Sequence, residues 1–195
     1  MKSDQFMKPK DMIVAFAIPT TRQEFIDGQS RNDKQFAKRY RNSWERYCRQ
    51  VIKPLDILVE TIEHCGCNKI DHLTLGEFGR LCSCEQYKVI IVFAHGTEKS
   101  AEFADGMASI PDIVKQIPPD LEVFLHFAAC NSASLATEIK RHTPNCRITF
   151  HSKRIDPAFW IIFYNALIEY LYCNNSTYPD AFDLVRKHFI SESPK

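Results

Sequence analysis

Two apolar runs in the middle of the chain constrain its fold more than any other feature. Residues 89–94 are followed by His95, and residues 121–129 are followed by Cys130. Their length and their β-branched and aromatic content are typical of buried strands. The segment between them is long enough for a crossover that makes the two strands parallel. Because parallel strands deliver their carboxyl ends to one edge of a sheet, we expect the imidazole and the thiol to face one cleft.

Strand and helix patterns alternate along the rest of the chain. Further strands are expected at residues 12–18, 70–75 and 147–151. Helical spacing of apolar residues predicts helices at 34–63, 76–82, 110–116, 133–142, 157–172 and 177–188. Pro54 predicts a kink or a break in the first of these, and the polar stretch 20–33 predicts a loop above the carboxyl edge. The alternation predicts an α/β fold with a mainly parallel sheet, as one domain over residues 1–195.

The composition excludes several classes of partner. The formal net charge of +1 gives no electrostatic case for binding nucleic acid or a membrane surface. The first residues lack the apolar stretch of a signal peptide, and no window approaches the roughly 18 apolar residues of a spanning helix. With 45% hydrophobic residues the chain can bury a sizeable core without a disulfide framework. We therefore expect a soluble, cytoplasmic protein with reduced thiols and no nucleic-acid or membrane partner.

The pairing of His95-Gly96 with Ala129-Cys130 resembles the caspase-type cysteine peptidases and, within that group, the CHAT domain. The likeness covers residues 70–189 and includes the segment 103–106, Asn131, Ser132 and the run 159–167. It implies a caspase-like three-layer sandwich and a cysteine endopeptidase without a cofactor. It also implies a bacterial stress or antiphage pathway, a protein or peptide substrate, and a separately encoded activating or sensor protein.

Each residue of the predicted site has a chemical role. Cys130 is the expected nucleophile, because a thiolate is strongly nucleophilic and a nearby helix N-terminus favours it. His95 is the expected general base, which later protonates the leaving amine. The N–H groups of Gly96 and Cys130 would form the oxyanion hole, with Gly96 allowing the scissile carbonyl to approach. His126 lies inside a strand, four residues before Cys130, and is expected to be a core histidine.

The substrate pocket is less well defined by the sequence. In the caspase-type fold, the segment after the strand that follows the nucleophile lines this pocket, which here corresponds to Ser152, Lys153 and Arg154. The two cations either attract an acidic substrate side chain or are solvated loop charges. Ala128 occupies the position where caspases carry glutamine, so a preference for aspartate does not carry over.

Two Cys-x-Cys pairs form a second candidate site. Cys65 and Cys67 precede one predicted strand, and Cys82 and Cys84 precede the next, so both pairs are expected at the amino edge of the sheet. Four thiolates can hold a tetrahedral zinc, but structural sites usually have two to four intervening residues. We therefore expect reduced surface or half-buried thiols and no metal, with zinc as the lesser alternative. A catalytically inactive interaction module, with or without such a zinc, is therefore the alternative function. The remaining cysteines in apolar surroundings are expected to be inert core thiols: Cys48, Cys146 and Cys173.

Overall fold

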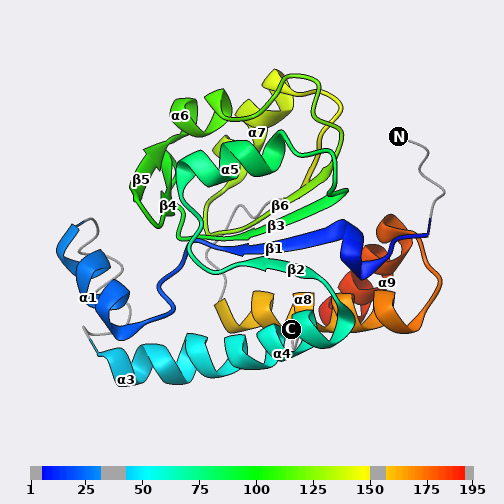
Figure 1. Ribbon diagram of the computed structural model, residues 1–195, viewed down its shortest axis with the longest axis horizontal. Helices are drawn as coiled ribbons and strands as arrows, with labels where there is room; N and C mark the ends of the chain where they lie inside the picture. The colour runs from blue at the N-terminus through cyan, green and yellow to red at the C-terminus, as the bar shows by residue number, and fades with distance from the viewer. Residues whose placement is uncertain (1–5, 32–42, 150–156, 192–195) are drawn as a thin grey trace.

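The central feature of the fold is a five-stranded parallel sheet (Figure 1). The computed structural model describes residues 6–31, 43–149 and 157–191. The strand order is β2-β1-β3-β6-β7. The strands are β1 (Met12–Phe16), β2 (Asn68–Ile70), β3 (Val89–Phe93), β6 (Phe124–Ala128) and β7 (Arg147–Thr149), and a separate antiparallel hairpin comprises β4 (Ser100–Phe103) and β5 (Gly106–Ser109). The predicted α/β class with a parallel sheet is confirmed.

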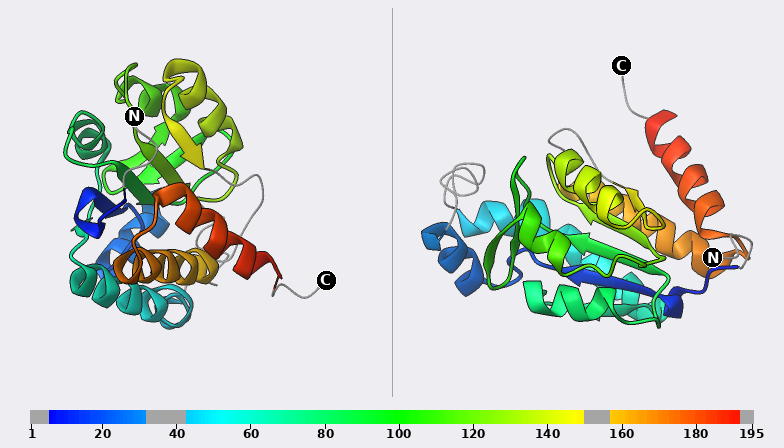
Figure 2. Two further views of the ribbon diagram at one scale, coloured as in Figure 1. Left: turned by 90° about the vertical axis from the view of Figure 1, so that its right-hand side faces the viewer. Right: turned by 90° about the horizontal axis from the view of Figure 1, so that it is seen from above.

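Helices cover both faces of the sheet, as Figure 1 shows. One layer contains α5 (Leu75–Cys82), α6 (Ile110–Lys115) and α7 (Ala133–His142), and the other contains α4 (Lys53–Cys65), α8 (Pro157–Cys173) and α9 (Tyr178–Ser191). The two further views in Figure 2 show the same separation. This arrangement of helices, sheet and helices is consistent with a caspase-like three-layer sandwich.

The core is divided into two parts by the sheet. Ile91 and Phe93 pack with the helices of the α4 and α8 layer, whereas Ile90 and Val92 pack with those of the α5 and α7 layer. Every residue of β1, β3 and β6 is buried. Such continuous burial is expected of parallel strands with helices on both faces, and it explains why these strands read as unbroken apolar runs.

The helical segment that precedes β2 contains one π-helical turn, which is wider than a turn of α-helix. The short helix α3 (Trp44–Tyr47) continues into a π-helical turn, η2 (Cys48–Ile52), and then into α4. The N–H of Lys53 bonds to the carbonyl of Cys48, five residues back. A proline at position 54 has no N–H and its ring clashes with the preceding turn of an α-helix, so a wider turn accommodates it. The chain stays helical from Trp44 to Cys65, so the irregularity near Pro54 is a π-helical turn and not a break into two helices.

Two predictions about the regions that follow β1 and β2 are wrong. The described part of residues 20–33 contains the helix α1 (Arg22–Arg31), not only a loop. Its start is fixed by Thr21 and Glu24, because the N–H of each residue bonds to the side chain of the other, at 3.1 and 3.3 Å. This reciprocal pattern is a capping box, which begins helices even in polar segments.

The strand predicted at residues 70–75 is shorter and lies earlier in the chain. β2 ends at Ile70, and α5 begins at Leu75 with Thr74 as its N-cap. Thr74 and Glu77 form a second capping box, which starts a helix at Leu75. The apolar residues that suggested a strand as far as residue 75 therefore do not extend β2. Among the described residues, no helix has the length and apolarity needed to cross a membrane.

Candidate active site

His95 and Cys130 leave two neighbouring strands at matching positions. Phe93 at the end of β3 pairs with Ala128 at the end of β6. Each candidate residue follows its paired residue by two positions. Adjacent strands lie about 4.8 Å apart, so the two chains emerge side by side at the carboxyl edge.

The two residues line one small cavity. Its volume is about 30 Å³, and its walls also include Ile18 after β1 and Trp160 and Ile161 of α8. A water molecule needs roughly 10–15 Å³ of such space, so the cavity has room for only about two. His95 and Cys130 are both half-buried. The structure thus brings the predicted pair together under the first turn of α8.

The loop that carries His95 is fastened to the β4 hairpin. The carbonyl of His95 accepts a hydrogen bond from the N–H of Glu102 at 2.8 Å, and the N–H of Thr97 donates to the carbonyl of Ser100 at 2.8 Å. These two bonds flank a bridge between Gly96 and Ala101. In an antiparallel pair of this kind, the central residues do not exchange hydrogen bonds. The bridge therefore leaves the N–H of Gly96 directed away from β4.

Gly96 packs closely against the cysteine segment. A Cβ atom placed on Gly96 would collide with the carbonyl oxygen of Cys130, and it would lie 3.2 Å from the Cβ of Ala129. Only glycine allows the two loops to approach this closely. Any side chain at position 96 must push the histidine and cysteine segments apart.

Cys130 lies at a tight turn between strand and helix. Asn131 has a φ of 53°, and Ser132 donates its hydroxyl to the carbonyl of Ala129 at 3.2 Å. Asparagine enters the left-handed region more readily than most residues, so this turn is accessible without glycine. α7 begins at Ala133, three residues after Cys130.

His126 is a core residue, as predicted. It is 1% exposed, and its Nε2 lies 2.9 Å from the hydroxyl of Tyr178. The ring also contacts Tyr164 edge-on, with ring centroids 5.9 Å apart. Burial without a compensating charge lowers the pKa of His126 to about 3. The imidazole is therefore neutral at physiological pH and buried away from the carboxyl edge.

The other predicted substrate-binding residues cannot be placed. Ser152, Lys153 and Arg154 lie outside the described residues. Their contribution to a substrate pocket stays a prediction.

The four cysteines of the Cys-x-Cys pairs do not form a metal site. Cys65 packs in the core on the α4 side of the sheet, whereas Cys82 packs in the core on the opposite side. Within the described ranges, no group of three or more potential ligands has the geometry to hold a metal ion. The geometry does not support the zinc alternative, because Cys65 and Cys82 lie on opposite faces of the sheet. Burial also raises the pKa of the Cys67 thiol to about 12 and that of Cys82 well above its usual range.

The three other cysteines differ from one another. Cys146 is fully buried, and burial raises the pKa of its thiol to about 11, as expected for an inert core residue. Cys48 is half-buried. Cys173 is exposed, so the prediction of a core position is wrong. Cys173 is the last residue of α8, where the chain leaves the core for a loop.

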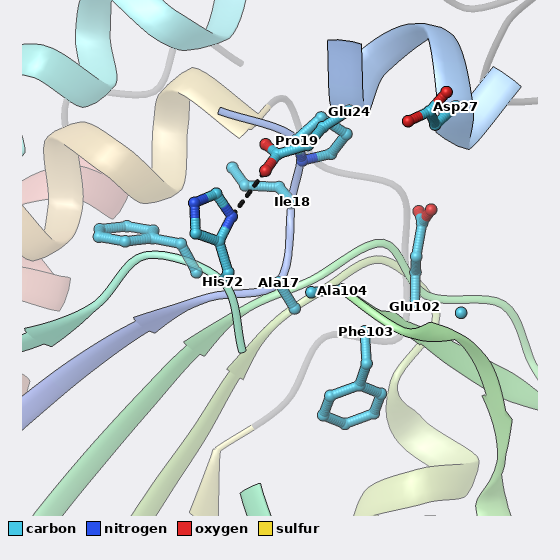
Figure 3. Close-up of a pocket in the computed structure, with 11 residues that line it drawn as sticks. Ala17, Ile18, Pro19, Glu24, Asp27, His72, Glu102, Phe103 and Ala104 are labelled. Carbon is cyan, nitrogen blue, oxygen red and sulfur yellow. Dashed lines mark ion pairs between the residues drawn. The ribbon is translucent and has the colours of Figure 1, made fainter. Parts of the chain in front are cut away.

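A second cavity beside the first was not predicted from the sequence (Figure 3). Its volume is about 190 Å³, and Ile18 lines both cavities. Its charged lining comes from three elements: Glu24 and Asp27 of α1, His72 after β2, and Glu102 of β4. Figure 3 shows Glu102 extending from β4 toward the side on which α1 carries the other two carboxylates.

Glu24 is held in place by several partners. One of its oxygens accepts hydrogen bonds from the N–H groups of Thr20 and Thr21, at 2.8 and 3.1 Å. The other oxygen lies 2.7 Å from Nδ1 of His72. Burial raises the pKa of Glu24, but these hydrogen bonds and the nearby histidine outweigh it, so the pKa lies below its usual value. Glu24 is therefore ionised at neutral pH. The signal that could have located it is the Thr21–Glu24 capping box, which places Glu24 and Asp27 one helical turn apart.

Comparison with known proteins gives no information about the function. No known protein family matches the chain, and no curated protein matches its sequence. The function must therefore be argued from the geometry of the sheet edge.

Proposed function

We propose that the protein is a caspase-like cysteine endopeptidase that cleaves protein substrates through Cys130 and His95. The observation that carries this proposal is their matched position after adjacent strands, on the wall of one cavity. A thiol next to an imidazole is the minimum requirement for a cysteine nucleophile with its base. The close packing of Gly96 against Cys130 supports the same assignment.

The residues account for each step of peptide hydrolysis. The sulfur of Cys130 bonds to the scissile carbonyl carbon while its proton passes to His95. The carbon–nitrogen bond then breaks, and His95 gives the proton to the leaving amine. Water next transfers a proton to His95 and its oxygen to the acyl carbon. The carbon–sulfur bond breaks, and the proton returns to the sulfur.

The backbone supplies the stabilisation of the intermediate. The negative charge on the carbonyl oxygen needs preorganised N–H donors. The N–H of Gly96 is directed away from β4, and we assign it this role together with the N–H of Cys130. A donor of this kind contributes about 10²- to 10³-fold to the rate.

The small size of the cavity supports a regulated enzyme. The cavity has space for only about two water molecules, and we propose that Trp160 and Ile161 in its wall move when peptide binds. A separately encoded activating or sensor protein is the proposed cause of this movement. We place the enzyme in the cytoplasm, in a bacterial stress or antiphage pathway, on the basis of the CHAT-like sequence motifs.

The decisive test is the identification of new protein termini in cells that express the protein. Expression of the natural sequence should generate cleaved termini that disappear with Cys130→Ala. Cys84→Ala is the matched control, because it removes a half-buried thiol at the opposite edge of the sheet. The same termini in the Cys130→Ala cells would refute the proposal.

The alternative is an inactive caspase-like module that binds peptides or a signalling partner. The small volume of the cavity is the observation that favours it. A labelled peptidyl electrophile separates the two, because only a peptidase gives rapid labelling at Cys130 that His95→Ala removes. Slow labelling that is equal in both proteins would support the inactive module.

A further inference from the structure

The β4–β5 hairpin connects the loop of His95 to the start of α5. At the base of the hairpin, the N–H of Glu102 donates to the carbonyl of His95 at 2.8 Å. At its tip, the N–H of Ala104 donates to the carbonyl of Leu73 at 2.9 Å. A shift of the tip therefore reaches the loop of the proposed general base through β4 itself.

Asp105 adds a second hydrogen bond at the tip of the hairpin. Its Oδ1 accepts a hydrogen bond from the N–H of Leu75 at 3.0 Å. Leu75 is the first residue of α5, so its N–H has no partner within the helix. The helix dipole stabilises a carboxylate at this end, and hydrogen bonds to charged groups are stronger than neutral ones. Asp105 therefore fastens the tip more firmly than the backbone bond of Ala104 does alone.

The start of α5 is a firm anchor for this bond. Leu73 is fully buried, and its N–H donates to the carbonyl of Phe16 at the end of β1, at 2.9 Å. Phe78 of α5 packs against Phe103 of β4, with ring centroids 5.7 Å apart. The tip of the hairpin is thus tied to the central sheet.

Gly106 permits the tight turn that presents Asp105 to α5. Only Ala104 and Asp105 separate β4 from β5. Gly106 has a φ of 129°, which residues with a Cβ rarely adopt. A Cβ placed there would meet no atom within 4 Å, so glycine is needed here for its backbone and not for space. The segment 103–106 of the CHAT-like resemblance thereby gains a structural role.

On the basis of the proposed peptidase function, we propose that Asp105 is a positioning residue for His95. Its carboxylate holds the tip of the hairpin, and the base of the hairpin holds the carbonyl of His95. A general base must lie within hydrogen-bonding reach of the proton that it takes, and a displacement of about 1 Å can lower the rate by about 10²-fold. Asp105 does not line the cavity of His95 and Cys130, so it acts through β4 and not on the substrate.

The kinetic test uses a peptide chosen from the cleaved termini. Asp105→Ala should lower kcat by about 5- to 50-fold with KM within about twofold, because the base is displaced while the substrate contacts remain. Asp105→Asn keeps an acceptor oxygen for the N–H of Leu75, so its kcat should stay within about threefold of that of the natural sequence. Asp180→Ala is the matched control, because it removes an exposed carboxylate that bonds to Thr177 at the start of α9. Equal kcat values for Asp105→Ala and Asp180→Ala would overturn the proposal.

Amide hydrogen exchange, followed by NMR, separates this inference from the proposed function. It is measured in the folded Cys130→Ala protein, so it needs no catalysis. Adding Asp105→Ala should speed exchange of the Glu102 N–H by about 10-fold or more relative to adding Asp180→Ala, because the hairpin opens more often. Asp105→Asn should restore slow exchange.

The two measurements distinguish the two failures. Unchanged exchange at Glu102 would overturn the role of Asp105 even if the natural sequence cleaves peptides. Faster exchange together with no cleavage by the natural sequence would refute the peptidase and retain the coupling between Asp105 and the loop of His95.

Discussion

The two edges of the central sheet arrange their reactive side chains in different ways. At the carboxyl edge, His95 and Cys130 follow adjacent strands at matching positions and share one cavity. At the amino edge, the Cys-x-Cys pairs precede β2 and β3, which are separated by β1. Their helices also cover opposite faces of the sheet. Residues at one edge therefore meet only when their strands are neighbours and the chain leaves both on compatible faces.

The edges differ in chemistry as well as in position. Burial raises the pKa of the Cys67 thiol to about 12, so it stays protonated at neutral pH. Cys130 at the carboxyl edge is half-buried and lies three residues before the start of α7. Because only Cys130, among the described cysteines, lies beside a histidine on the wall of a shared cavity, we expect peptide cleavage to depend on the carboxyl edge.

The largest expected effect is the loss of peptide cleavage when the thiol at the carboxyl edge is removed. Cys130→Ala should reduce peptide cleavage by about 10⁴-fold or more, because no other group supplies the nucleophile. Cys84→Ala should leave kcat/KM within about twofold. Both are measured with purified protein whose circular dichroism matches that of the natural sequence. Cleavage that survives in well-folded Cys130→Ala would show that the carboxyl edge is not the reactive one.

The second prediction compares the two histidines of the central strands. His95→Ala should cost about 10²- to 10⁴-fold in kcat/KM, the contribution of a general base. His126→Ala should instead lower the melting temperature, because it leaves a cavity and removes the partner of the Tyr178 hydroxyl. If His126→Ala were folded and inactive while His95→Ala cleaved normally, the two roles would be reversed.

A third prediction concerns the pH dependence of stability. The pKa of His126 is about 3 in the folded protein and about 6.5 when unfolded. The unfolded state therefore binds more protons between these values, and stability falls as the pH drops below about 6.5. The expected loss from this residue between pH 7 and pH 4 is about 3 kcal/mol. Chemical unfolding of His126→Phe should show a shallower pH dependence, and an unchanged slope would contradict the pKa.

The smallest effect is expected from metal removal. Because the Cys-x-Cys pairs lie on opposite faces, the purified protein should contain less than about half a zinc per chain. A chelator should change the melting temperature by less than about 1 °C. One zinc per chain that is lost in both Cys65→Ser and Cys82→Ser would contradict this prediction. It would show that the thiols at the amino edge lie close enough to bind one metal ion.

The strands and the placement of His95 and Cys130 at one edge were predictable because their signals are local and strong. The apolar runs at 89–94 and 121–129 identify buried strands, and parallel pairing then places His95 and Cys130 at one edge. The irregular turn beside Pro54 was predictable for a similar reason. A proline lacks an N–H and its ring clashes with the preceding turn of any α-helix. The helix α1 was missed because residues 20–33 are polar, although the Thr21–Glu24 capping box is visible in the sequence.

The failures depend on information that is not local. The face from which a helix approaches the sheet decides whether Cys65 and Cys82 can meet, and no spacing in the sequence encodes it. The acidic cavity combines Glu24 of α1 with Glu102 of β4, which are far apart in the chain. Such a site can be recognised only when the tertiary arrangement is known.

The π-helical turn at Cys48–Ile52 has a consequence for how the chain tolerates changes in length. Each residue advances an α-helix by about 100°, so the extra residue in this turn sets the angular phase between α3 and α4. Val51 of this turn lines the cavity of His95 and Cys130, and Tyr47 just before it donates its hydroxyl to the carbonyl of Pro19 at 2.7 Å. Deleting one residue here would rotate Tyr47 away from Pro19 while α4 stayed in place. A single deletion in this turn would therefore misalign the wall of the cavity that His95 and Cys130 share.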